Sequence, residues 1–270
     1  MSLVRYFARL PYFLGIWQRL QLGSVAARVE WGVFPYPHYA YGVYWAAVTA
    51  SRLKIPRISV LEFGVAGGRG LLALENVSEQ IERELGVGID VVGFDSGAGM
   101  PAATDYRDLP HIWAPGFYQM EVDKLRARLK RAQLVLGDVA TTTRQWMLEA
   151  TRAPIGFVAF DLDYYSSTKA AFTVFEGPET SHLPRVYCYF DDVVSNALGC
   201  MNEYVGELLA IREYNEGHPD RKVCRINGLR VHRPRWEIWQ EQMFAFHNFS
   251  HSQYSVLVIP KGHGDTQLPL

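Results

Sequence analysis

Five short runs rich in β-branched and aromatic residues alternate with longer stretches whose apolar residues recur at helical spacing. This alternation is typical of β-α-β units, which fold into a parallel sheet with helices packed on it. Each run ends in an acid or a glycine, at the edge where open α/β sheets hold their ligands. We expect five strands, over residues 57–64, 89–95, 132–138, 155–161 and 185–191.

The remaining third of the chain is expected to complete the sheet. A helical pattern over 200–216 follows the fifth run, a sixth strand is expected over 222–226, and a last strand over Tyr254–Ile259. We expect the last strand to run antiparallel to the others. Five parallel strands and a closing pair form the α/β, Rossmann-like, seven-stranded and mostly parallel sheet that class I methyltransferases share.

Composition limits the number of domains and the partners. The chain has 270 residues and a formal net charge of -1, with a pI of about 6.7. The length suits one large domain, expected over residues 51–270. The balanced charge argues against nucleic acid, which requires a basic surplus. Cys188, Cys200 and Cys224, an odd number without CxxC spacing, predict reduced, largely buried thiols in a cytoplasmic protein.

Residues 1–50 form a separate N-terminal segment in this interpretation. Arg5, Arg9, Pro11 and Arg19 interrupt its apolar residues, so no run is long enough to span a bilayer. We expect a lid or a dimerisation arm through which the protein self-associates. An amphipathic helix lying on a membrane surface is the alternative.

The N-terminal segment contains the aromatic stretch VEWGVFPYPHYAYGVYW, over residues 29–45. Aromatic rings at this density stack on apolar or ring-bearing ligands, which favours a lid over a small-molecule acceptor. Core packing and dimer contacts use the same residues. Tyr36, Tyr39 and Tyr41 are therefore candidates for substrate contact.

A glycine-rich loop, VLEFGVAGGRGLLAL, joins the first expected strand to its helix. Gly64, Gly68 and Gly70 let the backbone turn sharply and approach a ligand without a side chain. Gly68-x-Gly70-x-x-Ala73 matches the dinucleotide fingerprint. Glu62-x-Gly64-x-x-x-Gly68-x-Gly70 resembles motif I of enzymes that use S-adenosylmethionine (SAM). The glycines alone leave both cofactors open.

Polar residues after the next two strands extend the candidate cofactor site. Asp95 ends the second strand, where it is expected to accept hydrogen bonds from ribose hydroxyls under either interpretation, and Ser96 follows it. Asp138 follows the third strand, at the place where SAM enzymes contact adenine. The alternative for each acid is a helix N-cap or an exposed loop residue.

Four carboxylates follow the fourth and fifth strands: Asp161 and Asp163 in FDLDYYSST, and Asp191 and Asp192 in RVYCYFDDVV. These strands are neighbours in the expected sheet, so the acids should converge at one edge. Carboxylates that lie close together repel one another unless a cation neutralises them. Oxygen ligands without His or Cys favour a hard cation such as Mg²⁺. The alternative is that each pair favours the N-terminus of a following helix.

The segment DLDYYSST resembles the D-x-D-x-Y-x-S-T segment of the macrocin O-methyltransferase family, Mg²⁺-dependent enzymes that methylate sugar hydroxyls of natural products. YFDDVV is similar to that family's second acidic motif, and GFDSGAGMP resembles its turn after the second strand. The resemblance implies that Asp161, Asp191 and Asp192 hold the metal and that Asp163 is the general base. Residues 96–100 depart from the family's turn, which puts the acceptor in doubt.

The resemblance implies an enzyme that moves a methyl group from SAM to a hydroxyl of a sugar or other diol-bearing small molecule. His111, on the loop after the second strand, is the other candidate base or substrate contact, with a solvated surface imidazole as its alternative. Two other functions remain: a nicotinamide-dependent oxidoreductase, which leaves both acid pairs unexplained, and a SAM-binding partner subunit without catalysis.

Overall fold

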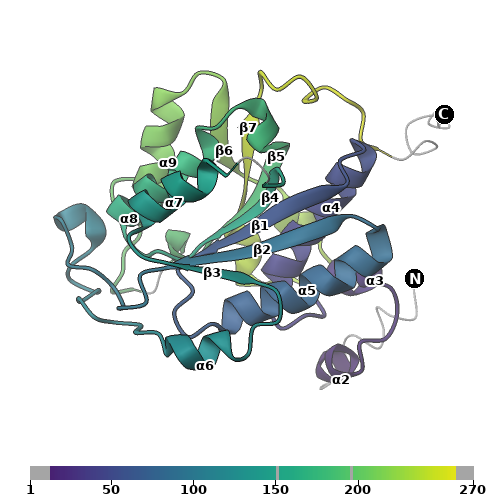
Figure 1. Ribbon diagram of the computed structural model, residues 1–270, viewed down its shortest axis with the longest axis horizontal. Coiled ribbons are helices and arrows are strands. Elements are labelled where there is room, and N and C mark those ends of the chain that lie inside the picture. The colour runs from purple at the N-terminus through teal and green to yellow at the C-terminus, as the bar shows by residue number, and fades with distance from the viewer. Residues whose placement is uncertain (1–12, 150–151, 195–196, 260–270) are drawn as a thin grey trace.

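The computed structural model describes residues 13–149, 152–194 and 197–259. A seven-stranded sheet crosses the molecule in the order β3-β2-β1-β4-β5-β7-β6 (Figure 1). All neighbours from β3 to β5 pair in parallel, whereas β7 pairs antiparallel with both β5 and β6. The expected fold, including an antiparallel last strand, is therefore confirmed. The strands are β1 (Arg57–Phe63), β2 (Gly88–Asp95), β3 (Gln133–Leu136), β4 (Ile155–Phe160), β5 (His182–Phe190), β6 (Arg221–Arg225) and β7 (Met243–Asn248).

Helices cover both faces of the sheet, so the central strands are buried on both sides. One apolar core lies between the sheet and α3, α4 and α5, and a second lies between the sheet and α7, α8 and α9 (Figure 1). The helices are α2 (Phe13–Leu20), α3 (Val25–Glu30), α4 (Pro37–Arg52), α5 (Arg69–Leu85), α6 (Val122–Arg126), α7 (Val139–Met147), α8 (Tyr165–Ala171), α9 (Gly206–Gly217) and α10 (Leu229–His232).

The prediction of a last strand over Tyr254–Ile259 is wrong. The last strand is β7, which contains the buried residues Met243 and Phe246 and fills the edge of β5. Leu257 is 77% exposed and has no strand partner, although it belongs to a continuous apolar run. Local hydrophobicity selected the wrong run because a strand also requires hydrogen-bonding partners, and β7 takes its place between β5 and β6.

Other boundaries differ less. The helix expected over 200–216 begins at Gly206, and the division at residue 50 falls inside α4, which packs against β1, β4 and β5. The prediction of buried thiols holds for Cys188 and is wrong for Cys200 and Cys224, which are exposed. No helix in the described ranges has both the length and the apolarity to cross a membrane. Residues 1–12 of the predicted arm lie outside the described residues, so self-association through it stays a prediction.

Four phenylalanines stand side by side at the ends of the central strands. Phe63 pairs in register with Phe94 on one side and Phe160 on the other, and Phe160 pairs with Phe190. Neighbouring rings stack on one another. Their centroids are 4.7 Å apart for Phe63–Phe94, 5.6 Å for Phe63–Phe160 and 4.6 Å for Phe160–Phe190. The row ends the hydrophobic part of the sheet, and the residue after each ring begins the polar edge.

Gly64 follows Phe63 at the end of β1. Its backbone has a φ of 84° and lies against the residue that follows β4. A Cβ at this position would lie 1.8 Å from the carbonyl oxygen of Asp161. We therefore expect Gly64→Ala to lower the free energy of unfolding by about 3 kcal/mol, through backbone strain and the displacement of β4. Urea unfolding measures this change.

Gly67→Ala is the matched control, because an added Cβ there meets nothing within 4 Å and the φ is not positive. We expect it to change stability by less than about 0.5 kcal/mol. Equal stability of the two variants would contradict the steric account of Gly64.

Candidate active site

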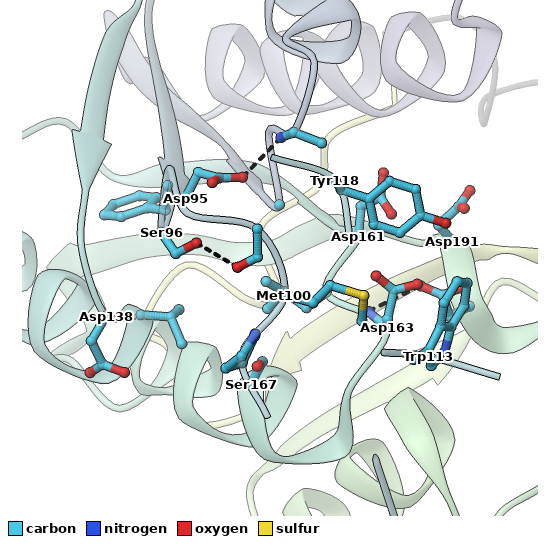
Figure 2. Close-up of a pocket in the computed structure, with 18 of the residues that line it drawn as sticks. Asp95, Ser96, Met100, Trp113, Tyr118, Asp138, Asp161, Asp163, Ser167 and Asp191 are labelled. Atoms are coloured by element: carbon cyan, nitrogen blue, oxygen red, sulfur yellow. Dashed lines mark hydrogen bonds between the residues drawn. The ribbon is translucent and has the colours of Figure 1, made fainter. Parts of the chain in front are cut away.

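A cavity of about 620 Å³ opens at the carboxyl edge of the sheet, beyond the row of phenylalanines (Figure 2). Its volume lies in the range that binds small molecules and cofactors. Among the residues singled out from the sequence, those that line it are Gly64, Asp95, Ser96, Asp138, Asp161, Asp163, Asp191 and Asp192. Those that do not line it are Glu62, Gly68, Gly70, Tyr36, Tyr39, Tyr41 and His111.

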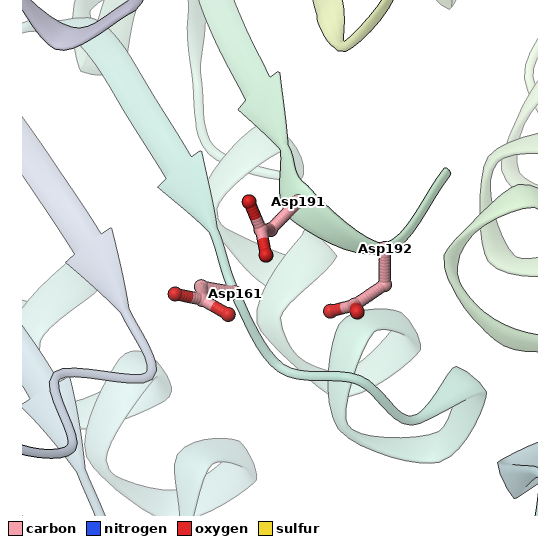
Figure 3. A group of neighbouring side chains, drawn as sticks. All are labelled: Asp161, Asp191 and Asp192. Carbon is pink, nitrogen blue, oxygen red and sulfur yellow. The ribbon is translucent and has the colours of Figure 1, made fainter. Parts of the chain in front are cut away.

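Asp161, Asp191 and Asp192 bring their carboxylates together at the ends of β4 and β5 (Figure 3). Each offers an oxygen that lies within 4.8 Å of an oxygen of the other two. The parallel pairing of Phe160 with Phe190 places Asp161 beside Asp191, since each acid is the next residue along its strand. The three acids that the resemblance assigns to a metal therefore form one cluster.

The cluster carries concentrated negative potential. Burial raises the pKa of Asp161 well above its ordinary value, and the neighbouring Asp191 and Asp192 raise it further. Burial, with Asp163 and Asp191 nearby, likewise raises the pKa of Asp192. In the part of the chain that the structure describes, no Lys or Arg forms an ion pair with these acids. Among the described residues, no ion pair therefore relieves the repulsion.

Asp163 lies beside the cluster rather than within it. Its backbone adopts a φ of 59°, which asparagine and aspartate tolerate better than other side chains, and its N–H donates to Asp192 Oδ2 at 3.2 Å. The residue is 8% exposed. Burial, followed by the charge of Asp191, raises the pKa of Asp163 to about 7. The side chain thus faces the cavity near the acids without belonging to their closest group.

Glu207, in the first turn of α9, is a buried acid at this site that sequence reasoning missed. It is fully buried, its Oε2 accepts a hydrogen bond from the backbone N–H of Asp192 at 3.1 Å, and its Oε1 lacks a partner among the described residues. Burial, then Asp192, raises its pKa well above the ordinary value. No local motif marks this glutamate, because only the packing of α9 brings it here.

Asp191 is held by side chains from two other elements. The Tyr189 hydroxyl donates to its carboxylate, and Gln242 Nε2 donates to its carbonyl oxygen at 2.7 Å. The ring of Tyr189 stacks on His38 of α4, with centroids 4.1 Å apart. Burial lowers the pKa of His38 to about 3, so the imidazole that supports this stack is neutral. These contacts fix the direction of the Asp191 carboxylate.

Asp95, Ser96 and Asp138 lie at the other end of the cavity from the acid cluster (Figure 2). Asp95 Oδ2 accepts hydrogen bonds from the backbone N–H groups of Val65 and Ala66, at 2.9 and 2.8 Å. It therefore fastens the glycine loop to the end of β2. Asp138 is the N-cap of α7, because its carboxylate accepts a hydrogen bond from the Thr141 N–H. It also lines the cavity.

Glu62 lies under α4 instead of in the cavity. It is 2% exposed, and its Oε1 accepts a hydrogen bond from the Tyr39 hydroxyl at 2.7 Å. Gly70 gives room for this carboxylate, because a Cβ there would lie 1.9 Å from Glu62 Oε1. Burial, partly offset by the Tyr39 hydrogen bond, raises the pKa of Glu62 to about 8.

The aromatic residues proposed as a lid pack within the protein. Tyr39 is 2% exposed beside Glu62, and Tyr36 packs on Tyr39 with centroids 5.3 Å apart. Tyr41 packs between Trp239 and Tyr187. His111 is exposed on the loop after β2 and does not line the cavity.

Four residues that were not among the predicted site residues also line the cavity: Met100, Trp113, Tyr118 and Ser167 (Figure 2). Three of them belong to the long loop between β2 and α6. Tyr118 extends over Asp161 and Asp191 (Figure 2), and burial, followed by the charges of Asp163 and the other three acids, raises its pKa. The sequence feature that could have indicated these three residues is the long, aromatic-rich loop that follows β2 at the carboxyl edge of the sheet.

No family model matches the chain, and neither does any curated protein sequence. Solved structures do match. CalS11, a calicheamicin methyltransferase, is 19% identical, with 92% of this chain and 90% of that one covered and a TM-score of 0.50. The O-methyltransferase NovP is 13% identical, covers 77% and 78%, and has a TM-score of 0.49. TomG of Streptomyces achromogenes, an O-methyltransferase involved in tomaymycin synthesis and solved with SAM, is 14% identical, covers 77% and 78%, and has a TM-score of 0.40.

Identities this low show the fold alone, and the match to CalS11 reaches a TM-score of 0.50. The chain has the Rossmann-like fold of class I methyltransferases, in agreement with the strand order and the antiparallel β7. The function must therefore be argued from the cavity.

The buried Glu62 provides a test of the site's electrostatics. An acid whose pKa rises from 4.5 to about 8 on folding makes the folded state lose stability as the pH rises between those values. The full pKa shift corresponds to a loss of about 5 kcal/mol in the free energy of unfolding. Because the protein around the charged carboxylate relaxes, we expect an observed loss on the order of 2–4 kcal/mol. Glu62→Gln does not titrate, so we expect it to gain stability relative to the natural chain between pH 5 and pH 8. Urea unfolding at both pH values measures the difference, and a difference independent of pH would contradict the assignment.

Proposed function

We propose that the protein is a SAM-dependent O-methyltransferase that acts on a hydroxyl of a sugar or another diol-bearing small molecule with the help of a divalent cation. The observation that carries this proposal is the cluster of Asp161, Asp191 and Asp192 in the same cavity as Asp95 and Asp138, on a methyltransferase fold. The finer resemblance to the macrocin O-methyltransferase family, which rests on DLDYYSST and YFDDVV, belongs to the same proposal.

The donor set fits a hard divalent cation. Asp161, Asp191 and Asp192 offer only oxygen atoms, and the distances between those atoms allow one ion to contact all three. Hard cations such as Mg²⁺ prefer carboxylate and water oxygens. Tyr189 and Gln242 orient Asp191 from behind, as supporting hydrogen bonds do at metal sites. Bound there, the cation would supply positive charge that favours ionisation of an acceptor hydroxyl.

The opposite end of the cavity suits the methyl donor. Asp95 ends β2 at the position where Rossmann-like proteins bind ribose hydroxyls, and Asp138 and Val139 lie beyond it. The glycine loop contributes Gly64 and Ala66 to the wall. The sulfonium of SAM is cationic and is attracted by the acids at the centre of the cavity, whereas the diphosphate of a nicotinamide cofactor is repelled by them. This charge difference favours SAM over the dinucleotide.

The reaction is a direct displacement. The acceptor oxygen attacks the methyl carbon, an O–C bond forms, and the S–C bond breaks with its electron pair going to sulfur. The sulfonium becomes a neutral thioether, S-adenosylhomocysteine, and the hydroxyl proton passes to a carboxylate oxygen of Asp163. Asp163 suits this role because it faces the cavity beside the cluster and its raised pKa makes it a better proton acceptor than an ordinary aspartate. No nucleophilic side chain is required.

Two other functions make different predictions. A nicotinamide-dependent oxidoreductase would bind NAD(P)H in calorimetric titration, whereas the proposed enzyme would bind SAM. A SAM-binding partner subunit would bind SAM but transfer no methyl group, with or without Mg²⁺. The carboxylate cluster favours the enzyme over both, because neither alternative uses it.

Removal of the proposed base tests the mechanism. We expect Asp163→Asn to lower kcat by about 10²–10⁴-fold, since the amide cannot accept the proton, while the affinity for SAM stays unchanged. Transfer of a labelled methyl group gives kcat, and calorimetry gives SAM affinity. Asp90→Asn is the control, because Asp90 is an exposed partner of Arg57 and does not line the cavity. Full activity of Asp163→Asn would assign the proton to another group.

Removal of a proposed ligand tests the metal site without requiring an acceptor. We expect Asp191→Ala to weaken Mn²⁺ binding by at least about 10-fold, because one of the three clustered carboxylates is lost. Titration of Mn²⁺ followed by electron paramagnetic resonance measures the affinity of the free protein. Asp90→Asn should bind Mn²⁺ as the natural chain does. Mn²⁺ binding that is unaffected by Asp191→Ala would remove the metal from the proposal.

A further inference from the structure

Helix α2 presents an apolar stripe that the described chain leaves largely uncovered. Phe13, Ile16, Trp17 and Leu20 recur at helical spacing, so they share one face of the helix. None of the residues of α2 is buried, and Ile16 and Leu20 are 56% and 59% exposed. Leu22, two residues after the helix, is 60% exposed and adds to this surface. Neighbouring exposed apolar side chains of this kind mark sites of contact with a partner or a membrane.

The helix is attached to the molecule by its tryptophan. The ring of Trp17 packs on Trp31 with centroids 6.4 Å apart, and its Nε1 donates to the Leu22 carbonyl at 2.7 Å. Figure 1 shows α2 at the periphery, outside the helices that cover the two faces of the sheet. The position of α2 is thus defined by these contacts, while Ile16 and Leu20 remain exposed.

The charge of the N-terminal segment has one sign. The first 24 residues contain three arginines, Arg5, Arg9 and Arg19, and no Asp or Glu, in a chain whose formal net charge is -1. Arg5 and Arg9 lie outside the described residues. Arg19 is exposed in the last turn of α2, and none of the ion pairs in the described chain includes it. A cationic segment without acids that carries an apolar stripe is typical of helices that lie on anionic membranes.

Two occupants compete for such a face, and charge distinguishes them. A second copy of the chain that packed stripe against stripe would bring arginines together, with no acid of the segment to pair with them, which is unfavourable. An anionic bilayer supplies an apolar layer for the stripe and phosphates for the arginines. Because α2 has eight residues and is roughly 12 Å long, it is too short to cross the bilayer and would lie along its surface.

The attachment of α2 lies away from the glycine loop. Helix α3, which follows α2, is held by Glu84, whose carboxylate accepts a hydrogen bond from the Val25 N–H at 2.6 Å. Glu84 is in the last turn of α5, and the glycine loop precedes the first turn of this helix of 17 residues, roughly 25 Å away. A membrane bound by α2 and a cofactor bound at the glycine loop therefore use separate parts of the protein.

From these features we propose that α2 and Leu22 dock the protein on an anionic lipid surface. Ile16, Leu20 and Leu22 enter the boundary between the headgroups and the acyl chains, and Arg19 pairs with lipid phosphates. The ring of Trp17 lies at the level of the headgroups, where tryptophan is enriched. This docking goes beyond the proposed function and does not depend on it.

Vesicle sedimentation with the full chain tests the docking. One set of vesicles contains phosphatidylcholine alone, and the other contains phosphatidylcholine and phosphatidylglycerol in equal parts. We expect the protein to sediment with the anionic vesicles and to stay in the supernatant with the neutral ones. Added salt should reduce the binding, because it screens the arginines. Failure to bind the anionic vesicles would overturn the proposal, as would equal binding to both sets.

The double substitution Ile16→Ser and Leu20→Ser tests the stripe. Both side chains are exposed, so we expect the fold to be kept while the partition coefficient onto anionic vesicles falls at least about 10-fold. The matched control is Leu148→Ser with Leu257→Ser, because these leucines are 84% and 77% exposed and lie outside α2. Unchanged binding of the first variant, or an equal loss in both, would overturn the assignment to α2.

The substitution Arg19→Gln tests the charge. We expect binding to anionic vesicles to weaken about 5-fold, because one cation near the lipid phosphates is lost. Arg144→Gln is the control, because Arg144 is an exposed arginine of α7, on the opposite face of the sheet. Equal binding by Arg19→Gln and Arg144→Gln would contradict the pairing of Arg19 with phosphate.

Sedimentation equilibrium without vesicles measures the rival occupant. We expect the natural chain to have the same mass as the variant with Ile16→Ser and Leu20→Ser. Self-association that this double substitution abolishes would assign the stripe to a second copy of the chain and overturn the membrane proposal. Calorimetry with SAM should give the same affinity for every variant, because α2 and the glycine loop are separate, and equal affinity shows that each variant is folded.

Discussion

The site depends on the register of four parallel strands. Phe63, Phe94, Phe160 and Phe190 pair directly across β1, β2, β4 and β5, and their stacked rings close the core at one level. The next residue on each strand therefore reaches the solvent edge at the same height. A slip of one strand by one residue would break the alignment of the stacked rings and carry its acid away from the others, so the packing of the rings favours this register. The carboxylates converge because the rings are aligned.

This convergence carries an electrostatic penalty that no ion pair among the described residues relieves. Asp161 and Asp192 have raised pKa values, Glu207 is fully buried behind Asp192, and no Lys or Arg in the described part of the chain pairs with the clustered acids. A site of this kind attracts cations, both a divalent ion and a sulfonium, and repels anions. The proposed donor and the proposed metal are both consequences of the same potential.

The N-terminal aromatic stretch supports the site from within the core. Tyr39 donates to Glu62 beneath the glycine loop, and His38 stacks on Tyr189, whose hydroxyl holds Asp191. Helix α4 thus contacts residues that support both the glycine loop and the acid cluster. The aromatic residues that line the cavity come instead from the loop after β2, with Trp113 and Tyr118.

The sequence by itself determined the parallel strands, the glycine loop and the acids at the ends of β4 and β5, because periodicity and strand-end composition are local and survive in the linear pattern. It misplaced the last strand, because an apolar run such as that around Leu257 becomes a strand only if it finds hydrogen-bonding partners, and β7 is the segment that pairs with β5 and β6. Only the tertiary structure decided which aromatic rings face the core and which face the cavity, and it alone brought Glu207 to Asp192. Those choices depend on contacts between segments far apart in the chain, which no local pattern records.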